Sequence, residues 1–118
     1  MPSTPEIIIA QKEAERALLG ALLIEGTIPD DTPIKRVAEL LSPSDFLDAQ
    51  FHDNLHSRIF AAMLQCLHPH QIAVAQELSR KGALRKGDCA YLVELVSECP
   101  CSCAFLEYAE ILSNYAHQ

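Results

Sequence analysis

The sequence predicts an all-α fold, a compact orthogonal bundle of about six helices. Apolar residues recur at steps of three and four along the chain, and no segment shows the sustained alternation of a β-strand. The 118 residues are 49% hydrophobic and include no tryptophan, so Leu, Ala, Ile and Val must build the core, as is common where helices pack on helices. We expect one helical domain over residues 11–118, preceded by a flexible arm over residues 1–10.

The first helix is expected over residues 11–25. Residues 1–10 ahead of it hold two prolines and show no periodic pattern, which indicates the arm. Ala14 and Leu18 then lie on one face, and Gly26 ends the helix.

Five further helices follow from the same spacing. Proline, glycine or a short polar run separates each from the next, and such residues favour turns. The expected elements are a short helix over residues 34–41, a longest and central helix from Leu55 to about Leu67, a fourth helix that Gly82 ends, a short fifth helix around residues 91–96, and a last helix over residues 102–117 that Ser102 caps.

The charge of the chain argues against a domain that grips a nucleic acid. The formal net charge is −7, whereas contacts to phosphates require a basic surplus. Four of the nine basic residues, Arg80, Lys81, Arg85 and Lys86, lie around Gly82, where cations complement the negative end of a helix dipole. We therefore expect no direct contact with nucleic acid.

No segment predicts a membrane span or a signal peptide. The longest uncharged apolar run covers residues 17–24, which is far short of the roughly 20 residues that a spanning helix needs. The five cysteines are an odd number, which fits a reduced compartment better than a disulfide framework. We expect a cytoplasmic protein that does not enter a membrane.

Three cysteines alternate in a loop before the last helix. Cys99, Cys101 and Cys103 could ligate zinc or exchange with a disulfide, since both need deprotonated sulfur. Structural zinc usually takes four ligands in paired spacing, and no second cysteine pair exists. We therefore interpret the three as small loop residues and expect Cys66 and Cys89 in the core, keeping a thiol or zinc module as an alternative.

The sequence offers no catalytic, cofactor-binding or metal-binding motif. His52 and His56 are spaced to share one face of a helix, but Asp53 and Leu55 depart from the H-E-x-x-H pattern. None of the four glycines stands in a G-x-x-x-x-G-K-[ST] frame. We therefore expect this chain not to hydrolyse nucleotides by itself.

Several ordered segments carry a family resemblance. The first three read A-E-R-A-L-L-G-A-L-L over residues 14–23, L-S-P-S-D-F over residues 41–46, and H-S-R-I-F-A-A-M over residues 56–63. The closing half holds Gly82-Ala83-Leu84, Gly87, Ala90-Tyr91-Leu92, Leu95, Pro100 and Tyr108-Ala109. In this order and spacing they resemble the N-terminal domain of DnaB-type bacterial replicative DNA helicases.

The shared residues fit packing roles. Gly20 should let a neighbouring helix approach closely, and the Pro-x-Asp-Phe turn should cap the third helix. The chain departs from the family pattern by a few added residues between Phe46 and His56 and a few missing ones after Leu67. In addition, Asp88 replaces the second glycine of a Gly-Gly pair, and Ala104 replaces an asparagine.

The resemblance implies an interaction domain without chemistry of its own. Such a domain takes part in assembling or regulating the hexameric ring and in contacts with primase, while ATP and Mg²⁺ belong to the motor domain of the longer parent protein. We expect self-association, as a dimer or within a hexamer, and the first interface candidates are Leu106 and Tyr115. The helicase-binding C-terminal domain of a primase is an alternative with a similar helical fold.

Overall fold

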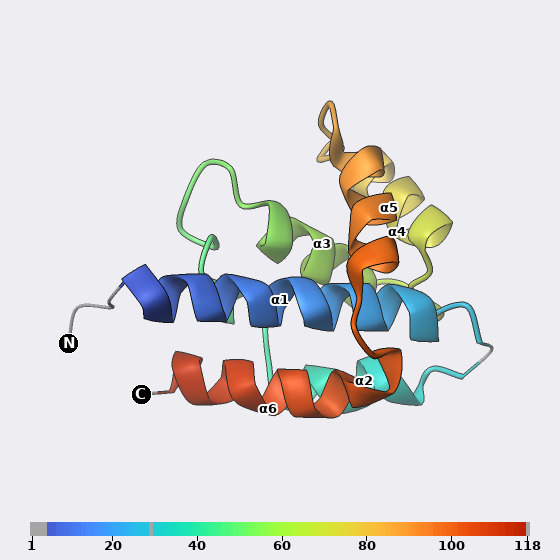
Figure 1. Ribbon diagram of the computed structural model, residues 1–118. Coiled ribbons are helices and arrows are strands. Elements are labelled where there is room, and N and C mark those ends of the chain that lie inside the picture. Colours follow the sequence, from blue (N-terminus) through green and yellow to red (C-terminus); the bar gives the residue numbers. More distant parts are fainter. Residues whose placement is uncertain (1–4, 29, 118) are drawn as a thin grey trace.

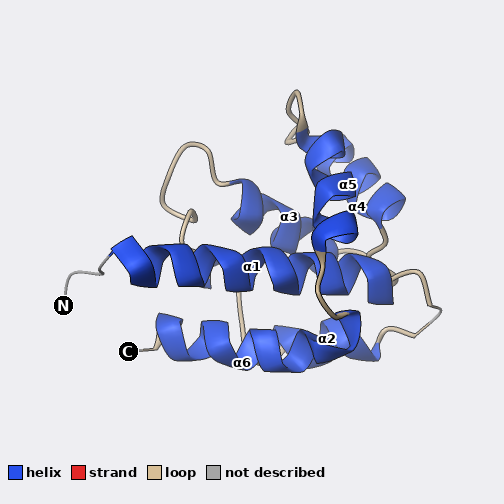
Figure 2. Ribbon diagram, in the orientation of Figure 1, coloured by secondary structure: helices blue, strands red, loops and turns tan. Residues whose placement is uncertain are grey.

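The computed structural model describes residues 5–28 and 30–117. Within these ranges the chain forms six α-helices and two 3₁₀ turns, with no strand (Figure 2). The elements are α1 (Pro5–Glu25), α2 (Thr32–Ala38), η1 (Pro43–Asp45), α3 (Leu55–Leu64), α4 (Gln71–Arg80), α5 (Asp88–Glu98), η2 (Ser102–Ala104) and α6 (Phe105–Ala116). The all-α prediction is confirmed.

Helix α1 is the central element of the bundle. Helices α2 and α6 lie along one side of it, and α6 runs antiparallel to it, whereas α3, α4 and α5 lie on the other side (Figure 1). The axes of α5 and α6 differ by 98°, in agreement with the predicted orthogonal arrangement. The prediction that the third helix is longest and central is wrong, because α1 has 21 residues and α3 only 10.

The core surrounds the middle of α1. Every residue from Leu18 to Leu23 is buried, so this stretch meets neighbours on all sides. The other buried apolar side chains of the cluster are Ile34, Val37, Leu41, Phe46, Ile59, Phe60, Ala62, Met63, Val74, Leu78, Leu92, Leu95, Ala109 and Leu112. Since each large aliphatic side chain contributes roughly 1.5–3 kcal/mol on burial, this single cluster explains why one domain forms.

Two glycines allow the backbone to approach α1 closely. A Cβ atom on Gly20 would lie 2.3 Å from the carbonyl oxygen of Leu95, and one on Gly26 would lie 2.6 Å from the carbonyl carbon of Pro69. The predicted role of Gly20 is therefore confirmed, and its partner is α5. Gly26 follows the last residue of α1, and the turn that leads into α4 packs against it.

The ends of the first and last helices differ from the sequence prediction. Helix α1 begins at Pro5, so the arm expected over residues 1–10 is helical from that residue onward, and residues 1–4 lie outside the described part. Proline is tolerated in the first turn, and the exposed side chains of this turn give no periodic signal. Ser102 belongs to η2 instead of capping α6, and its hydroxyl donates to the Glu25 carboxylate at 3.2 Å.

No single helix in residues 5–28 and 30–117 is long and apolar enough to cross a membrane. The bent pair of α5 with η2 and α6 reaches that length and composition, but the chain turns by 98° between them.

Candidate interaction surface and the polar network behind it

A buried glutamate joins three separate parts of the chain. Glu15 of α1 is 1% exposed, and its carboxylate accepts a hydrogen bond from the backbone N–H of Leu47 at 2.7 Å. The second carboxylate oxygen accepts from Nδ1 of the buried His56 of α3 at 2.8 Å. Both oxygens of this carboxylate are thus satisfied, as a charge inside a core requires.

The network continues from His56 to α5. With Nδ1 as the donor, Nε2 of His56 accepts from the Tyr91 hydroxyl at 2.5 Å, and the two rings stack with centroids 5.7 Å apart. The Arg16 guanidinium lies over the Tyr91 ring and donates to its hydroxyl at 3.5 Å. Arg16 also pairs with Glu98, so α1 and α5 are joined at a second point.

This network has the composition of an acid–base relay, and its polar atoms are hydrogen-bonded to one another within the chain. Both ring nitrogens of His56 and both oxygens of Glu15 are occupied by partners within the chain. Burial raises the pKa of the Tyr91 hydroxyl, which therefore stays protonated near neutral pH. The arrangement can hold α1, α3 and α5 in place relative to one another, because its hydrogen bonds join side chains of all three helices.

An aspartate in the added stretch caps α3. The two carboxylate oxygens of Asp48 accept from the backbone N–H groups of His56 at 2.8 Å and Ser57 at 3.1 Å. The prediction that the Pro-x-Asp-Phe turn caps this helix is therefore wrong, because the Asp45 side chain bonds within its own turn. The turn contributes only the Pro43 carbonyl, which accepts from the Ser57 hydroxyl at 2.8 Å.

A buried ion pair between Arg58 and Asp88 holds the turn before α5. Asp88 is 5% exposed and accepts from the Arg58 guanidinium at 2.9 Å and from the backbone N–H of Arg85 at 2.9 Å. The same Arg58 nitrogen donates to the Ala83 carbonyl at 2.7 Å. Gly87, the residue before α5, has a φ of 89°, a left-handed conformation that suits glycine. Asp88, which replaces a glycine of the family pattern, therefore ties the turn before α5 to Arg58 of α3.

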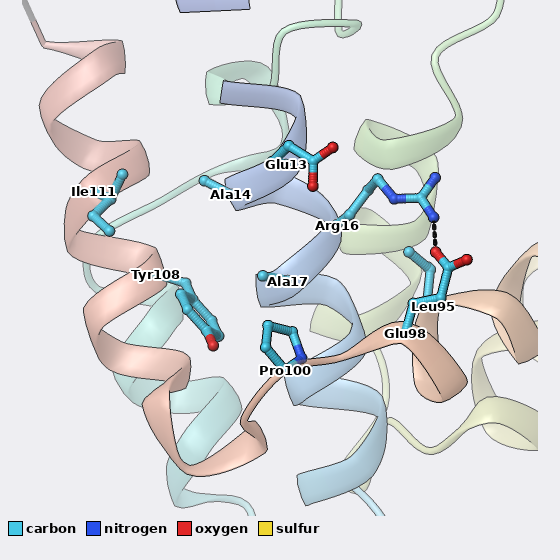
Figure 3. Close-up of a pocket in the computed structure, with 9 residues that line it drawn as sticks. All are labelled: Glu13, Ala14, Arg16, Ala17, Leu95, Glu98, Pro100, Tyr108 and Ile111. Carbon is cyan, nitrogen blue, oxygen red and sulfur yellow. Dashed lines mark hydrogen bonds and ion pairs between the residues drawn. The ribbon is translucent and has the colours of Figure 1, made fainter. Parts of the chain in front are cut away.

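A groove opens on the outer side of this framework, between α1, α5 and α6. Its volume is about 330 Å³, and its floor is formed by small and apolar side chains, with Arg16 and Glu98 at one edge (Figure 3). Leu95, Pro100, Tyr108 and Ile111 line it with Ala14, Ala17 and Glu13. Ile111 is 39% exposed, so an apolar surface is accessible to a partner here.

Comparison with known proteins identifies the family. The family described as "DnaB-like helicase N terminal domain" matches residues 9–114 of the chain. The chain belongs to this family. A crystal structure of the N-terminal domain of DnaB helicase from Mycobacterium tuberculosis superimposes with a TM-score of 0.70 at 30% sequence identity, covering 87% of this chain and 68% of that one. A search of curated protein sequences found no match.

Membership of the DnaB-like family confirms the resemblance deduced from the motifs. The comparisons favour this family over the two alternatives, a primase domain and a thiol or zinc module. The polar residues of its motifs form the network described above: Glu15 comes from the first motif, His56 from the third and Tyr91 from the closing half.

The two interface candidates lie on the helix that borders the groove of this helicase-family domain. Leu106 and Tyr115 of α6 are both half-buried, and Tyr115 packs against the core cluster. Between them, Ile111 lines the groove directly, which sequence reasoning did not single out. The proposal that Leu106 and Tyr115 contact a partner stays a prediction.

His52 and His56, which the sequence suggested could share one face of a helix, do not lie on the same helix. His52 is exposed in the loop before α3, whereas His56 is buried against Glu15. Across residues 5–28 and 30–117, no three His, Cys, Asp or Glu side chains converge as a metal site would require. The expectation that Cys89 lies in the core is wrong because this thiol is exposed on α5, whereas Cys66 is half-buried and donates to the Ala62 carbonyl.

The basic cluster around Gly82 is largely paired. Arg80 and Lys81 lie near the Glu77 carboxylate at 2.6 and 3.7 Å, and the Arg80 contact lowers the pKa of Glu77. Arg85 donates to the backbone carbonyl of His52 at 3.1 Å. These cations stabilise the end of α4 and the following turn, which supports the structural interpretation made from the sequence.

Proposed function

We propose that this chain is a non-catalytic interaction domain of a replicative DNA helicase, acting in ring assembly or its regulation and in contacts with primase. The family match over residues 9–114 is the observation that carries the proposal. On this view ATP and Mg²⁺ are bound by the motor domain of the parent helicase, and the domain works in the cytoplasm without gripping DNA itself. The net charge of −7 supports the last point.

The surface of α6 and the adjoining groove are our candidate contact region. The groove combines an accessible apolar floor with one cation and two carboxylates at its edge, a composition that suits a protein partner. Leu106 and Ile111 are both on α6, and neither takes part in the polar network. Aspartate at either position adds a charge to the surface while leaving the Glu15–His56 contact in place.

Two measurements test the proposal. Sedimentation velocity should show a dimer or larger species at high micromolar concentration, and a primase from the same genome should bind with measurable affinity. Leu106→Asp and Ile111→Asp should each weaken one of these associations by about tenfold or more, which corresponds to about 1.4 kcal/mol. The matched control is Leu67→Asp, which places the same charge at an exposed leucine in the loop before α4. A chain that stays monomeric and does not bind primase would overturn the proposal.

A further inference from the structure

Two exposed cysteines face each other in the turn between α5 and α6. The sulfur atoms of Cys101 and Cys103 lie 2.8 Å apart, and both residues are exposed. Even carbon atoms, which are smaller than sulfur, have their best non-bonded separation at roughly 3.5–4.0 Å. The pair therefore lies between ordinary contact and the roughly 2.0 Å of a disulfide bond, so little movement is needed to join the sulfurs.

The local backbone brings the two side chains together. Cys101 is extended, with φ −160° and ψ 110°, and the next residue, Ser102, begins the 3₁₀ turn η2. The Ser102 hydroxyl bonds to Glu25 at the end of α1, which holds the turn against the central helix. Among the described residues, no second sulfur lies against the other three cysteines: Cys99 is half-buried against the Ala17 carbonyl, Cys66 donates to the Ala62 carbonyl, and Cys89 is exposed.

We propose that Cys101 and Cys103 form a thiol–disulfide exchange site whose substrates are low-molecular-weight disulfides such as oxidised glutathione. This site is independent of the interaction role proposed above. It needs no metal ion.

The two thiols have distinct chemical roles. Either thiol can donate the hydrogen bond that joins the two sulfurs. With Cys103 as the donor, the contact lowers the pKa of Cys101 and makes Cys101 the attacking thiolate. The Cys101 thiolate attacks one sulfur of the small disulfide, forming a mixed disulfide and releasing one small thiol. Cys103, once deprotonated, attacks the Cys101 sulfur and releases the second small thiol.

This sequence of steps is balanced. Two protein thiols and one small disulfide give one protein disulfide and two small thiols. The two protons lost by the cysteines are taken up by the departing thiolates. The small disulfide is the oxidant, and an excess of small thiol reverses both steps.

The position of the pair gives the reaction a structural consequence. Oxidation closes a short ring across Ser102, within the turn where the chain bends by 98° between α5 and α6. Pro100 and Tyr108, on either side of this turn, line the groove on α1. Oxidation or reduction of the pair therefore takes place next to the candidate contact region.

The test uses the whole chain equilibrated in mixtures of reduced and oxidised glutathione. After acid quenching and alkylation, peptide mass spectrometry measures the state of each cysteine. We expect Cys101 and Cys103 to lose both alkylatable thiols together, with the mass loss of two hydrogens and no retained glutathione. Cys89 is the internal control, because this exposed cysteine should remain free or carry glutathione.

Two variants separate an intramolecular link from general thiol reactivity. In Cys103→Ser, Cys101 should accumulate as the glutathione mixed disulfide because the second step is blocked. Cys99→Ser should leave the link between Cys101 and Cys103 unchanged. The inference is overturned if both cysteines merely carry glutathione, as Cys89 does, or if the link joins Cys99 to either of them. Circular dichroism of each variant ensures that only folded protein is compared.

Discussion

Replacing Gly20 by alanine gives the most direct test of how the domain is packed. Gly20 lies in the buried middle of α1, where α5 crosses it. An alanine Cβ would lie 2.3 Å from the Leu95 carbonyl oxygen and 3.1 Å from the Cys99 Cβ. The first atom belongs to the backbone of a helix, so a side-chain rotation cannot relieve the overlap. The two helices would have to move apart.

Two opposing effects determine the sign of the change in stability. Alanine favours a helix interior over glycine by about 1 kcal/mol. Overpacking a core costs roughly 1–3 kcal/mol, and a contact with backbone at 2.3 Å belongs in the upper half of that range. The fully buried Leu95 side chain further limits how far α5 can shift. We therefore expect Gly20→Ala to lower the free energy of unfolding by about 1–2 kcal/mol.

Urea denaturation followed by circular dichroism measures this quantity, and thermal unfolding should show a melting temperature lower by roughly 4 °C per kcal/mol. Ala10→Gly, at an exposed site of the same helix, measures the difference in helix propensity between alanine and glycine alone. It should lower the free energy of unfolding by about 1 kcal/mol. If Gly20→Ala proves as stable as the original protein or more so, propensity dominates, and the close approach of α5 is not a packing constraint.

Three further changes probe the polar framework. The double-mutant cycle of Glu15→Ala and His56→Ala should give a coupling energy of about 0.5–3 kcal/mol in urea denaturation, and additivity would show that their 2.8 Å contact contributes nothing. Asp48→Ala should cost about 0.5–2 kcal/mol by uncapping α3, with Asp48→Asn milder, and equal stability of all three proteins would exclude the cap. Because burial raises the pKa of Tyr91 in the folded state, its contribution to stability is complete below the unfolded value of about 10 and lost as pH rises through the folded value. Tyr91→Phe should flatten this alkaline decline in a pH series of urea titrations, and an unchanged decline would contradict the assignment.

The sequence predicted those helices whose apolar faces are buried. The face of Leu18 and Leu22 gave a clear period, whereas the first turns of α1 did not, because Ile7 and Ile9 are 40% and 60% exposed. The length of α3 was overestimated since Leu67, counted in its apolar stripe, is 66% exposed in the following loop. Periodicity reports burial, and it misleads where apolar residues lie outside the core.

Only part of the buried network could have been predicted from the sequence. Glu15 lies three and seven residues before Leu18 and Leu22, so a charged side chain stands on the most apolar face of α1. That position signals a buried carboxylate with a partner. The partner His56 is 41 residues away, and helical periodicity carries no information about such a contact. The two exposed sulfurs of Cys101 and Cys103 also meet through a local turn that spacing alone did not reveal.

The motif residues explain why the family could be deduced when the partner surface could not. Gly20 sets how closely α5 approaches, and Glu15, His56 and Tyr91 tie α1, α3 and α5 to one another. All of them act between helices, so their order and spacing encode the arrangement of the bundle. The groove beside them depends instead on exposed side chains such as Ile111, which can change without disturbing these ties. Substitutions at the surface of α6 should therefore alter association while leaving stability nearly unchanged, and substitutions in the network should do the opposite.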